Sequence, residues 1–144
     1  REEYPEVDVP LSMIRKFKES YSYVGESESG ARVKVPVDGK PRKIEIGKQV
    51  GAACNQLLGE IFDSIKEVIS KASPQSVFGM LQNIVLTGGG SRVRNIDQEL
   101  QRLLIDDGYE EPDVRISSRE VMPFVGIGAL KVAKAAREDQ WIKP

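Results

Sequence analysis

The sequence has no histidine and only one cysteine, and these two absences restrict its chemistry before any motif is considered. Without histidine, the chain cannot form a Ser-His-Asp triad, most zinc sites or the most common general base. The single cysteine, Cys54, cannot form an internal disulfide, so a reducing compartment such as the cytoplasm is the simplest location. Cys54 falls on the apolar face of a predicted helix, and we interpret it as a core residue.

Long hydrophobic runs and a strong charge imbalance are also absent. No stretch approaches the roughly 20 apolar residues that span a bilayer, so we expect no direct membrane insertion. The net charge of −1 gives no general electrostatic reason to bind nucleic acid or an anionic membrane. With 40% hydrophobic and 30% charged residues among 144, the composition is typical of a soluble globular protein.

The chain begins at Arg1 without an initiator methionine, and its first residues are acidic and polar. They lack the basic and apolar regions of a secretory signal peptide. From these features we expect a processed piece or an excised fragment of a longer protein.

The most informative segment is a glycine-rich junction between a predicted strand and a predicted helix. An apolar run with β-branched residues at 83–87 predicts a buried strand. It is followed by Gly88, Gly89, Gly90, Ser91 and Arg92, and a helical pattern then starts at the N-cap Asn95, with Gln98 three residues on. Together these elements form a platform of N–H groups suited to a nucleotide or phosphate. A purely structural tight turn is the alternative.

Hydrophobic periodicity and turn signals divide the rest of the chain. A first helix is predicted from residue 9 or 10 to residue 23, with Asp8 as its cap. Asp38 and Gly39 supply a type I′ turn between strands at 31–37 and 41–46. The other predicted elements are helices at 47–71, 73–81, 95–104 and 123–137 and a strand at 113–116. The basic cluster at 40–43 is interpreted as solvated hairpin surface.

Three segments resemble the superfamily of actin, MreB and the heat-shock chaperone ATPases. Residues 84–93 resemble its adenosine-binding loop, and residues 13–24 resemble the actin helix that meets adenosine from the other side of the cleft. Residues 126–130 resemble its second connecting helix. Within the superfamily, the segments 4–6, 17–25 and 81–85 look most like the magnetosome bacterial actins, the MamK family.

The resemblance implies an α/β fold, namely the second (C-terminal) lobe of the actin-like, ribonuclease H-like ATPase fold. A smaller subdomain of a helix plus a β-hairpin would occupy residues 1–46. A larger subdomain with the glycine-rich adenosine loop would occupy residues 47–144. The intact protein would bind ATP or ADP with Mg²⁺ and assemble into homo-oligomeric cytoskeletal filaments. Its further partners would be the N-terminal lobe, outside this chain, and magnetosome adaptor proteins along magnetosome chains.

The resemblance also assigns residues to the adenosine side of the nucleotide cleft. From the loop these are Gly88, Gly89, Gly90, Ser91 and Arg92. From the first helix they are Arg15, Lys18 and Glu19, whose i, i+3, i+4 spacing puts them on one helix face. Glu19 can accept hydrogen bonds from ribose hydroxyls, and a cationic side chain can lie beside the base. Chemistry alone favours an ordinary solvated face for the three helix residues, and it is the matched register of the resemblance that favours the adenosine side instead.

The chain also departs from the superfamily's pattern. Actins carry a tyrosine beside adenine where this chain has Val93, so that stacking contact is doubtful. The two phosphate-binding hairpins, which hold the metal-organising carboxylates, have no counterpart in the sequence. We therefore assign no catalytic and no metal-binding residues, and we expect the chain alone not to hydrolyse ATP.

Two other functions remain open at this point. A Rossmann dinucleotide-binding enzyme would need a third glycine near Val93 and repeated β-α-β units, and the sequence has neither. A stand-alone, non-catalytic interaction module would explain why phosphate loops are lacking. In an excised lobe, residues 124–128 at the start of the last helix are the expected contact with the other lobe, which would leave apolar surface exposed.

Overall fold

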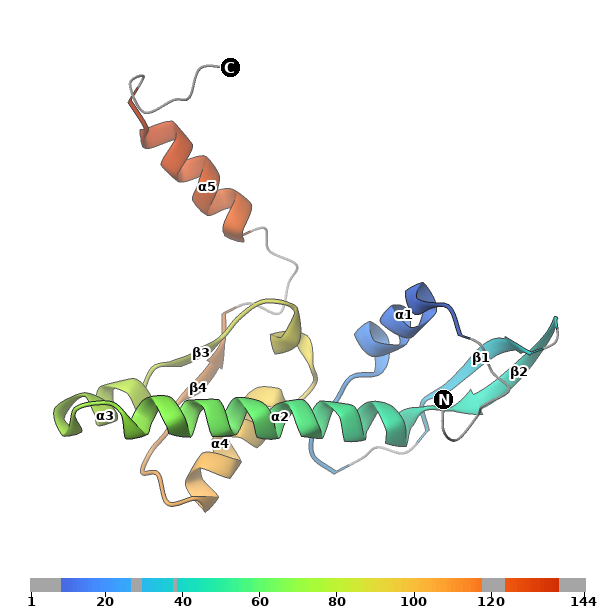
Figure 1. The fold of residues 1–144 in the computed structure, drawn as a ribbon, viewed down its shortest axis with the longest axis horizontal. Helices are drawn as coiled ribbons and strands as arrows, with labels where there is room; N and C mark the ends of the chain where they lie inside the picture. Colours follow the sequence, from blue (N-terminus) through green and yellow to red (C-terminus); the bar gives the residue numbers. More distant parts are fainter. Residues whose placement is uncertain (1–8, 27–29, 38, 118–123, 138–144) are drawn as a thin grey trace.

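The computed structural model describes residues 9–26, 30–37, 39–117 and 124–137. The helices are α1 (Leu11–Tyr21), α2 (Gly47–Ser70), α3 (Pro74–Leu81), a 3-10 turn η1 (Gly89–Arg92), α4 (Ile96–Asp106) and α5 (Phe124–Ala135). The strands are β1 (Arg32–Val37), β2 (Lys40–Glu45), β3 (Ile84–Leu86) and β4 (Val114–Ile116). In Figure 1, α2 runs along the length of the molecule, with the hairpin at one end and α3 at the other. These elements agree with the predicted order.

The hairpin and α1 form a small unit with its own apolar cluster. Strands β1 and β2 are antiparallel and pair Val33 with Ile44. Because alternate residues of a strand face the same side, Val33 and Val35 are buried together, and Phe17 of α1 packs against them. Gly39 has a φ of 73°, as the predicted tight turn requires, whereas Asp38 and the predicted cap Asp8 lie outside the described residues. The hairpin prediction is confirmed.

The larger apolar cluster forms between α2 and α4. Ile96, Leu100 and Leu104 recur at helical spacing along α4 and are almost completely buried. Opposite them, α2 contributes Cys54 and Leu58, and the thiol of Cys54 is free and buried, as predicted. The described residues thus form two separate apolar clusters, one under the hairpin and one between α2 and α4. The proposed subdomain boundary after residue 46 stays a prediction.

The sheet beside this cluster consists of two short parallel strands. β3 pairs with β4 in a register that sets Ile84 opposite Val114 and Leu86 opposite Ile116. The prediction of a buried strand over 83–87 is wrong in part, because Val85 is 53% exposed. Among the described residues, β3 pairs only with β4 and no element covers Val85. An apolar run indicates a strand, but it does not show what covers the strand.

The start of α4 also differs from the prediction. Asn95 occupies the N-cap position, as predicted, but its side chain makes no capping hydrogen bond. Its φ of 63° places it in the left-handed region, which asparagine tolerates better than most residues. The backbone carbonyl of Asn95 accepts the helical hydrogen bond from the Glu99 N–H at 2.9 Å. Asn95 therefore turns the chain into α4 rather than capping it.

Helix α5 stands apart from the rest of the molecule (Figure 1). Ile127, Leu130 and Val132 are 41%, 54% and 72% exposed. The side chains of Phe124 and Val125, two of the predicted contact residues, lie outside the described part of the structure. In the part of the chain that is described, no helix has the length and apolarity needed to cross a membrane.

Candidate functional site

The glycine loop between β3 and α4 closes into a single 3-10 turn. Gly88 has a φ of 79°, a conformation that glycine adopts without strain. Ser91 is buried, and its Oγ donates a hydrogen bond to the Gly88 carbonyl at 2.8 Å. Gly89 and Gly90 do not have positive φ, but a Cβ at either position would face open space. The loop therefore presents bare backbone on its outer side, where a ligand can approach closely.

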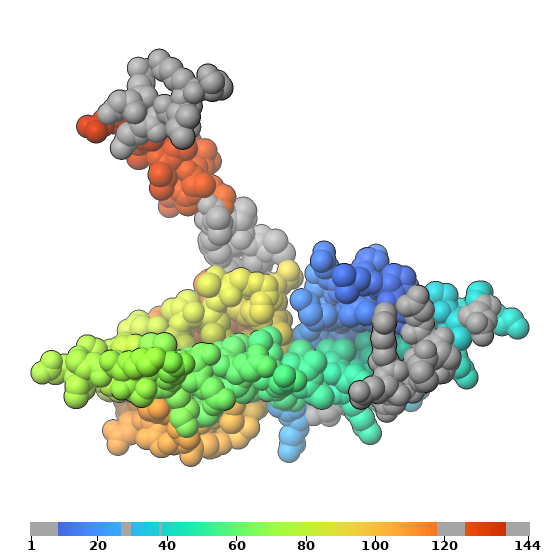
Figure 2. All heavy atoms as spheres, in the orientation of Figure 1, coloured from blue at the N-terminus to red at the C-terminus, as the bar shows by residue number. Residues whose placement is uncertain are grey.

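Helix α1 lies beside this loop, and both lie over α2. The atoms of α1 and of the η1 region are neighbours above α2 in Figure 2. The apolar stripe of α1, with Met13 and Phe17, packs on the hairpin cluster. Lys18 and Glu19 are exposed, and both line the space toward the loop.

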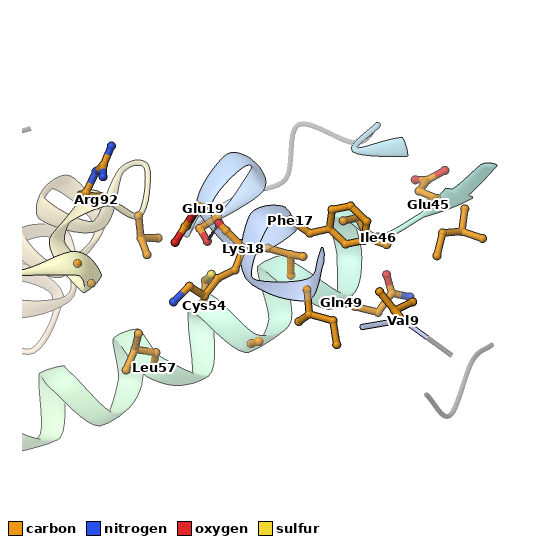
Figure 3. A pocket seen from close by; sticks show the side chains of 18 residues that line it. Val9, Phe17, Lys18, Glu19, Glu45, Ile46, Gln49, Cys54, Leu57 and Arg92 are labelled. Carbon is orange, nitrogen blue, oxygen red and sulfur yellow. Dashed lines mark hydrogen bonds between the residues drawn. The ribbon is translucent and has the colours of Figure 1, made fainter. Parts of the chain in front are cut away.

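A pocket of about 600 Å³ lies between α1, η1 and α2, within the range of small-molecule sites. It contains five of the predicted site residues, namely Lys18, Glu19, Gly89, Gly90 and Arg92 (Figure 3). The α2 side of the pocket consists of the polar Gln49 and the largely apolar Val50, Ala53, Cys54 and Leu57. The arrangement combines an apolar floor, suited to a flat base, with charged groups and exposed backbone at the rim.

The other three predicted residues do not line the pocket. Gly88 and Ser91 form the turn that holds Gly89 and Gly90 in place. Arg15 is exposed on α1 and lies outside the pocket lining. The three residues share one face of α1, as their spacing predicted, but only Lys18 and Glu19 line the pocket.

The α2 side of the pocket was not predicted. The apolar periodicity that predicts the helix at 47–71 does not reveal that Val50, Ala53 and Leu57 face a cavity. One signal was available, because Gly51, Ala52 and Ala53 are three consecutive small residues in this helix. Small residues in a helix often mark the close approach of another group.

In the described part of the chain, no group of three or more Asp, Glu, Cys or His side chains lies close enough together to hold a metal ion. The pocket itself offers only two carboxylates, Glu19 and Glu45. The described residues therefore do not fit a Mg²⁺ site of their own.

Sequence comparison assigns the chain to a family. A family model described as MreB/Mbl protein matches residues 12–118. The chain belongs to the MreB/Mbl family. The match includes α1, the hairpin, α2, the glycine loop, α4 and β4, and it therefore contains every residue that lines the pocket except Val9.

Among curated MreB/Mbl relatives, the actin-like protein MamK of Paramagnetospirillum magneticum strain AMB-1 is 29% identical over 141 residues, or 97% of this chain. MamK of Magnetospirillum gryphiswaldense is 33% identical over 95 residues, or 66% of this chain and 26% of that protein. The chain spans about 40% of the length of the first relative. It is thus similar to one part of these proteins.

Solved structures confirm the fold. The chain is similar to a MamK double helical filament, with a TM-score of 0.82, 28% identity, and coverage of 94% of this chain and 41% of that one. It is also similar to a non-polymerising MamK mutant bound to AMPPNP, with a TM-score of 0.76, 29% identity, and coverage of 92% and 40%. The predicted actin-like fold and the resemblance to MamK are therefore confirmed.

Proposed function

We propose that this chain supplies the adenosine side of the nucleotide cleft in an ATP-binding, filament-forming bacterial actin. The observation that carries the proposal is the pocket that brings Lys18 and Glu19 of α1 opposite Gly89, Gly90 and Arg92. Glu19 would accept hydrogen bonds from the ribose, Lys18 or Arg92 would lie beside the base, and the glycine backbone would approach the ligand. A relative with a similar structure binds AMPPNP, which supports a nucleotide as the occupant.

Assembly is the second part of the proposal. A relative with a TM-score of 0.82 forms a double helical filament, and we propose that the longer protein forms filaments with copies of itself. By the same analogy, we propose that Mg²⁺ accompanies the nucleotide and is held outside the described residues. The likeness to MamK supports a cytoplasmic, cytoskeletal role in organising magnetosomes, with adaptor proteins as further partners.

Nucleotide titration of the 144-residue chain, followed by NMR, tests the first part. We expect weak binding of ATP, ADP and adenosine with similar affinities, since the chain contributes no phosphate loops. Lys18→Ala and Glu19→Ala should each weaken binding about threefold to tenfold, as expected for one exposed polar contact. Arg15→Ala is the matched control, because Arg15 lies on the same helix but outside the pocket lining.

The outcomes separate the proposal from its alternatives. Equal losses for Arg15→Ala and Lys18→Ala would remove the reason to assign this pocket. Submicromolar ATP binding with strong discrimination against ADP would contradict a half-site. No binding of any adenosine compound would favour the stand-alone interaction module, whereas family membership already removes the Rossmann alternative.

A further inference from the structure

Residues 22–24, which follow α1, are hydrogen-bonded on one side to Arg94, which follows the glycine loop. The Arg94 N–H donates to the Ser22 carbonyl at 3.2 Å, and the Val24 N–H donates to the Arg94 carbonyl at 3.1 Å. These bonds form an isolated parallel bridge between Tyr23 and Arg94. Arg94 lies two residues beyond η1, so this bridge joins the two walls of the pocket through the backbone.

The same residues are bound on their other side to α2 through the side chain of Tyr23. The ring is 8% exposed, and its hydroxyl donates a hydrogen bond to the Gly47 carbonyl at 3.2 Å. A Cβ at Gly51 would lie 2.5 Å from Cζ and 3.2 Å from Cε1 of Tyr23, and closer still to its hydroxyl oxygen. Only a glycine at residue 51 therefore lets the ring lie against the helix.

Gly51 has no backbone reason to be glycine, because its φ is not positive and it lies inside a helix. Glycine in a helix interior is less favourable than alanine, because it loses more backbone entropy on folding. The contact with Tyr23 explains why this cost is tolerated. By contrast, Gly59 lies two turns further along the same helix, and nothing lies within 4 Å of the position that its Cβ would occupy.

We infer that Tyr23, seated on Gly51, is a positioning residue that fixes the spacing between the two walls of the nucleotide pocket. Tyr23 is the only described residue that combines a backbone bridge to Arg94 with a side-chain hydrogen bond to Gly47. Helix α1 has no buried residue of its own and packs through Met13 and Phe17 on the hairpin cluster, so the contact at Tyr23 is what ties it to the loop and to α2. The consequence for ligand affinity rests on the proposed nucleotide function, whereas the spacing itself does not.

The mechanism is preorganisation. A ligand held between Lys18 and Glu19 on one side and Gly89 and Arg92 on the other requires both walls at a fixed distance. If the contact between Tyr23 and Gly51 loosens, binding must first restore that distance. The apparent affinity is then the intrinsic affinity multiplied by the fraction of molecules that already have the correct spacing. An added methyl group at residue 51 would push the ring away from α2, because packed interiors accommodate extra volume poorly.

The spacing is measured without nucleotide, by pulsed electron paramagnetic resonance on the 144-residue chain. Spin labels are attached at Lys16→Cys on α1 and Gln98→Cys on α4, both exposed positions, in a Cys54→Ala background. We expect Gly51→Ala to shift or broaden the distance distribution and Gly59→Ala to leave it unchanged. Tyr23→Phe, which loses only the hydroxyl, should broaden it less than Gly51→Ala. If Gly51→Ala loses its helical circular dichroism, Tyr23→Leu takes its place with the same expected result.

Binding of ADP to the chain without labels is then compared for the two glycine variants. Gly51→Ala should weaken it about tenfold relative to Gly59→Ala, which corresponds to about 1.4 kcal/mol. Identical distance distributions for Gly51→Ala and Gly59→Ala would overturn the inference. A changed distribution in a chain that binds no nucleotide at all would support the positioning role of Tyr23 and contradict the proposed function instead.

Discussion

Helices α4 and α5 are similar in length and both carry apolar residues, yet among the side chains that the structure describes only those of α4 are buried. Leu100 and Leu104 of α4 have no exposed surface, whereas Leu130 of α5 is 54% exposed. The difference lies in their surroundings, since α4 packs against α2 and β4 while α5 stands apart (Figure 1). Apolar spacing makes a helix capable of burial, but a partner surface decides whether burial occurs.

The largest expected difference between α4 and α5 is in how much a single alanine substitution lowers the stability of the fold. Leu104→Ala should lower the free energy of unfolding by about 2–5 kcal/mol, because it opens a cavity in a packed core. Leu130→Ala should change it by less than about 0.5 kcal/mol, as is usual for exposed positions. Urea unfolding followed by circular dichroism measures both. Similar losses for the two variants would mean that α5 packs on the core in solution.

The second prediction concerns what α5 does with its exposed apolar surface. We expect the chain to self-associate, and we expect Ile127→Asp combined with Leu130→Asp to reduce the association at least severalfold without changing the unfolding free energy. Sedimentation velocity over a range of concentrations measures the effect. Lys131→Asp is the control, since it changes charge on the same helix and removes no apolar side chain. A chain that is monomeric at high concentration would contradict this prediction.

The smallest predicted effect comes from an exposed ion pair that holds the end of α4 against α2. Lys66 of α2 donates to Asp107, the residue after α4, with 2.9 Å between Nζ and Oδ2. This hydrogen bond raises the pKa of Lys66 above 10.5. The pair therefore stabilises the fold where both side chains are charged, and on the alkaline side its contribution is lost as the pH rises through the raised pKa of Lys66.

Lys66→Gln should therefore lower the urea midpoint slightly at neutral pH, by much less than Leu104→Ala, and the difference should vanish in strongly alkaline solution. Lys71→Gln is the control, because Lys71 pairs with Glu67 on the same helix and reaches no other element. An unchanged urea midpoint for Lys66→Gln at neutral pH would show that the ion pair between α2 and Asp107 contributes nothing measurable.

Local patterns were sufficient to predict most of the elements. The apolar periodicity along 47–71 predicted α2, and the Asp-Gly pair at residues 38–39 predicted the hairpin. Both predictions succeeded because helix periodicity and positive φ are properties of a few neighbouring residues. Residues 88–92 were recognised as a special loop for the same reason. The exposure of Val85 was missed, since it depends on which distant segments lie nearby. The left-handed conformation of Asn95 was missed because an asparagine before a helix is also a common side-chain N-cap.

The sequence by itself determined the family and the order of helices and strands. It also identified α1 and the glycine loop, the two segments that form opposite walls of the pocket. Only the tertiary structure decided which predicted residues share that pocket, since Lys18 and Arg92 are brought together by contacts between segments far apart in the chain. It also decided the role of Gly51, which is an ordinary helix residue until Tyr23 lies against it. Periodicity describes one element at a time, whereas a site depends on how several elements pack.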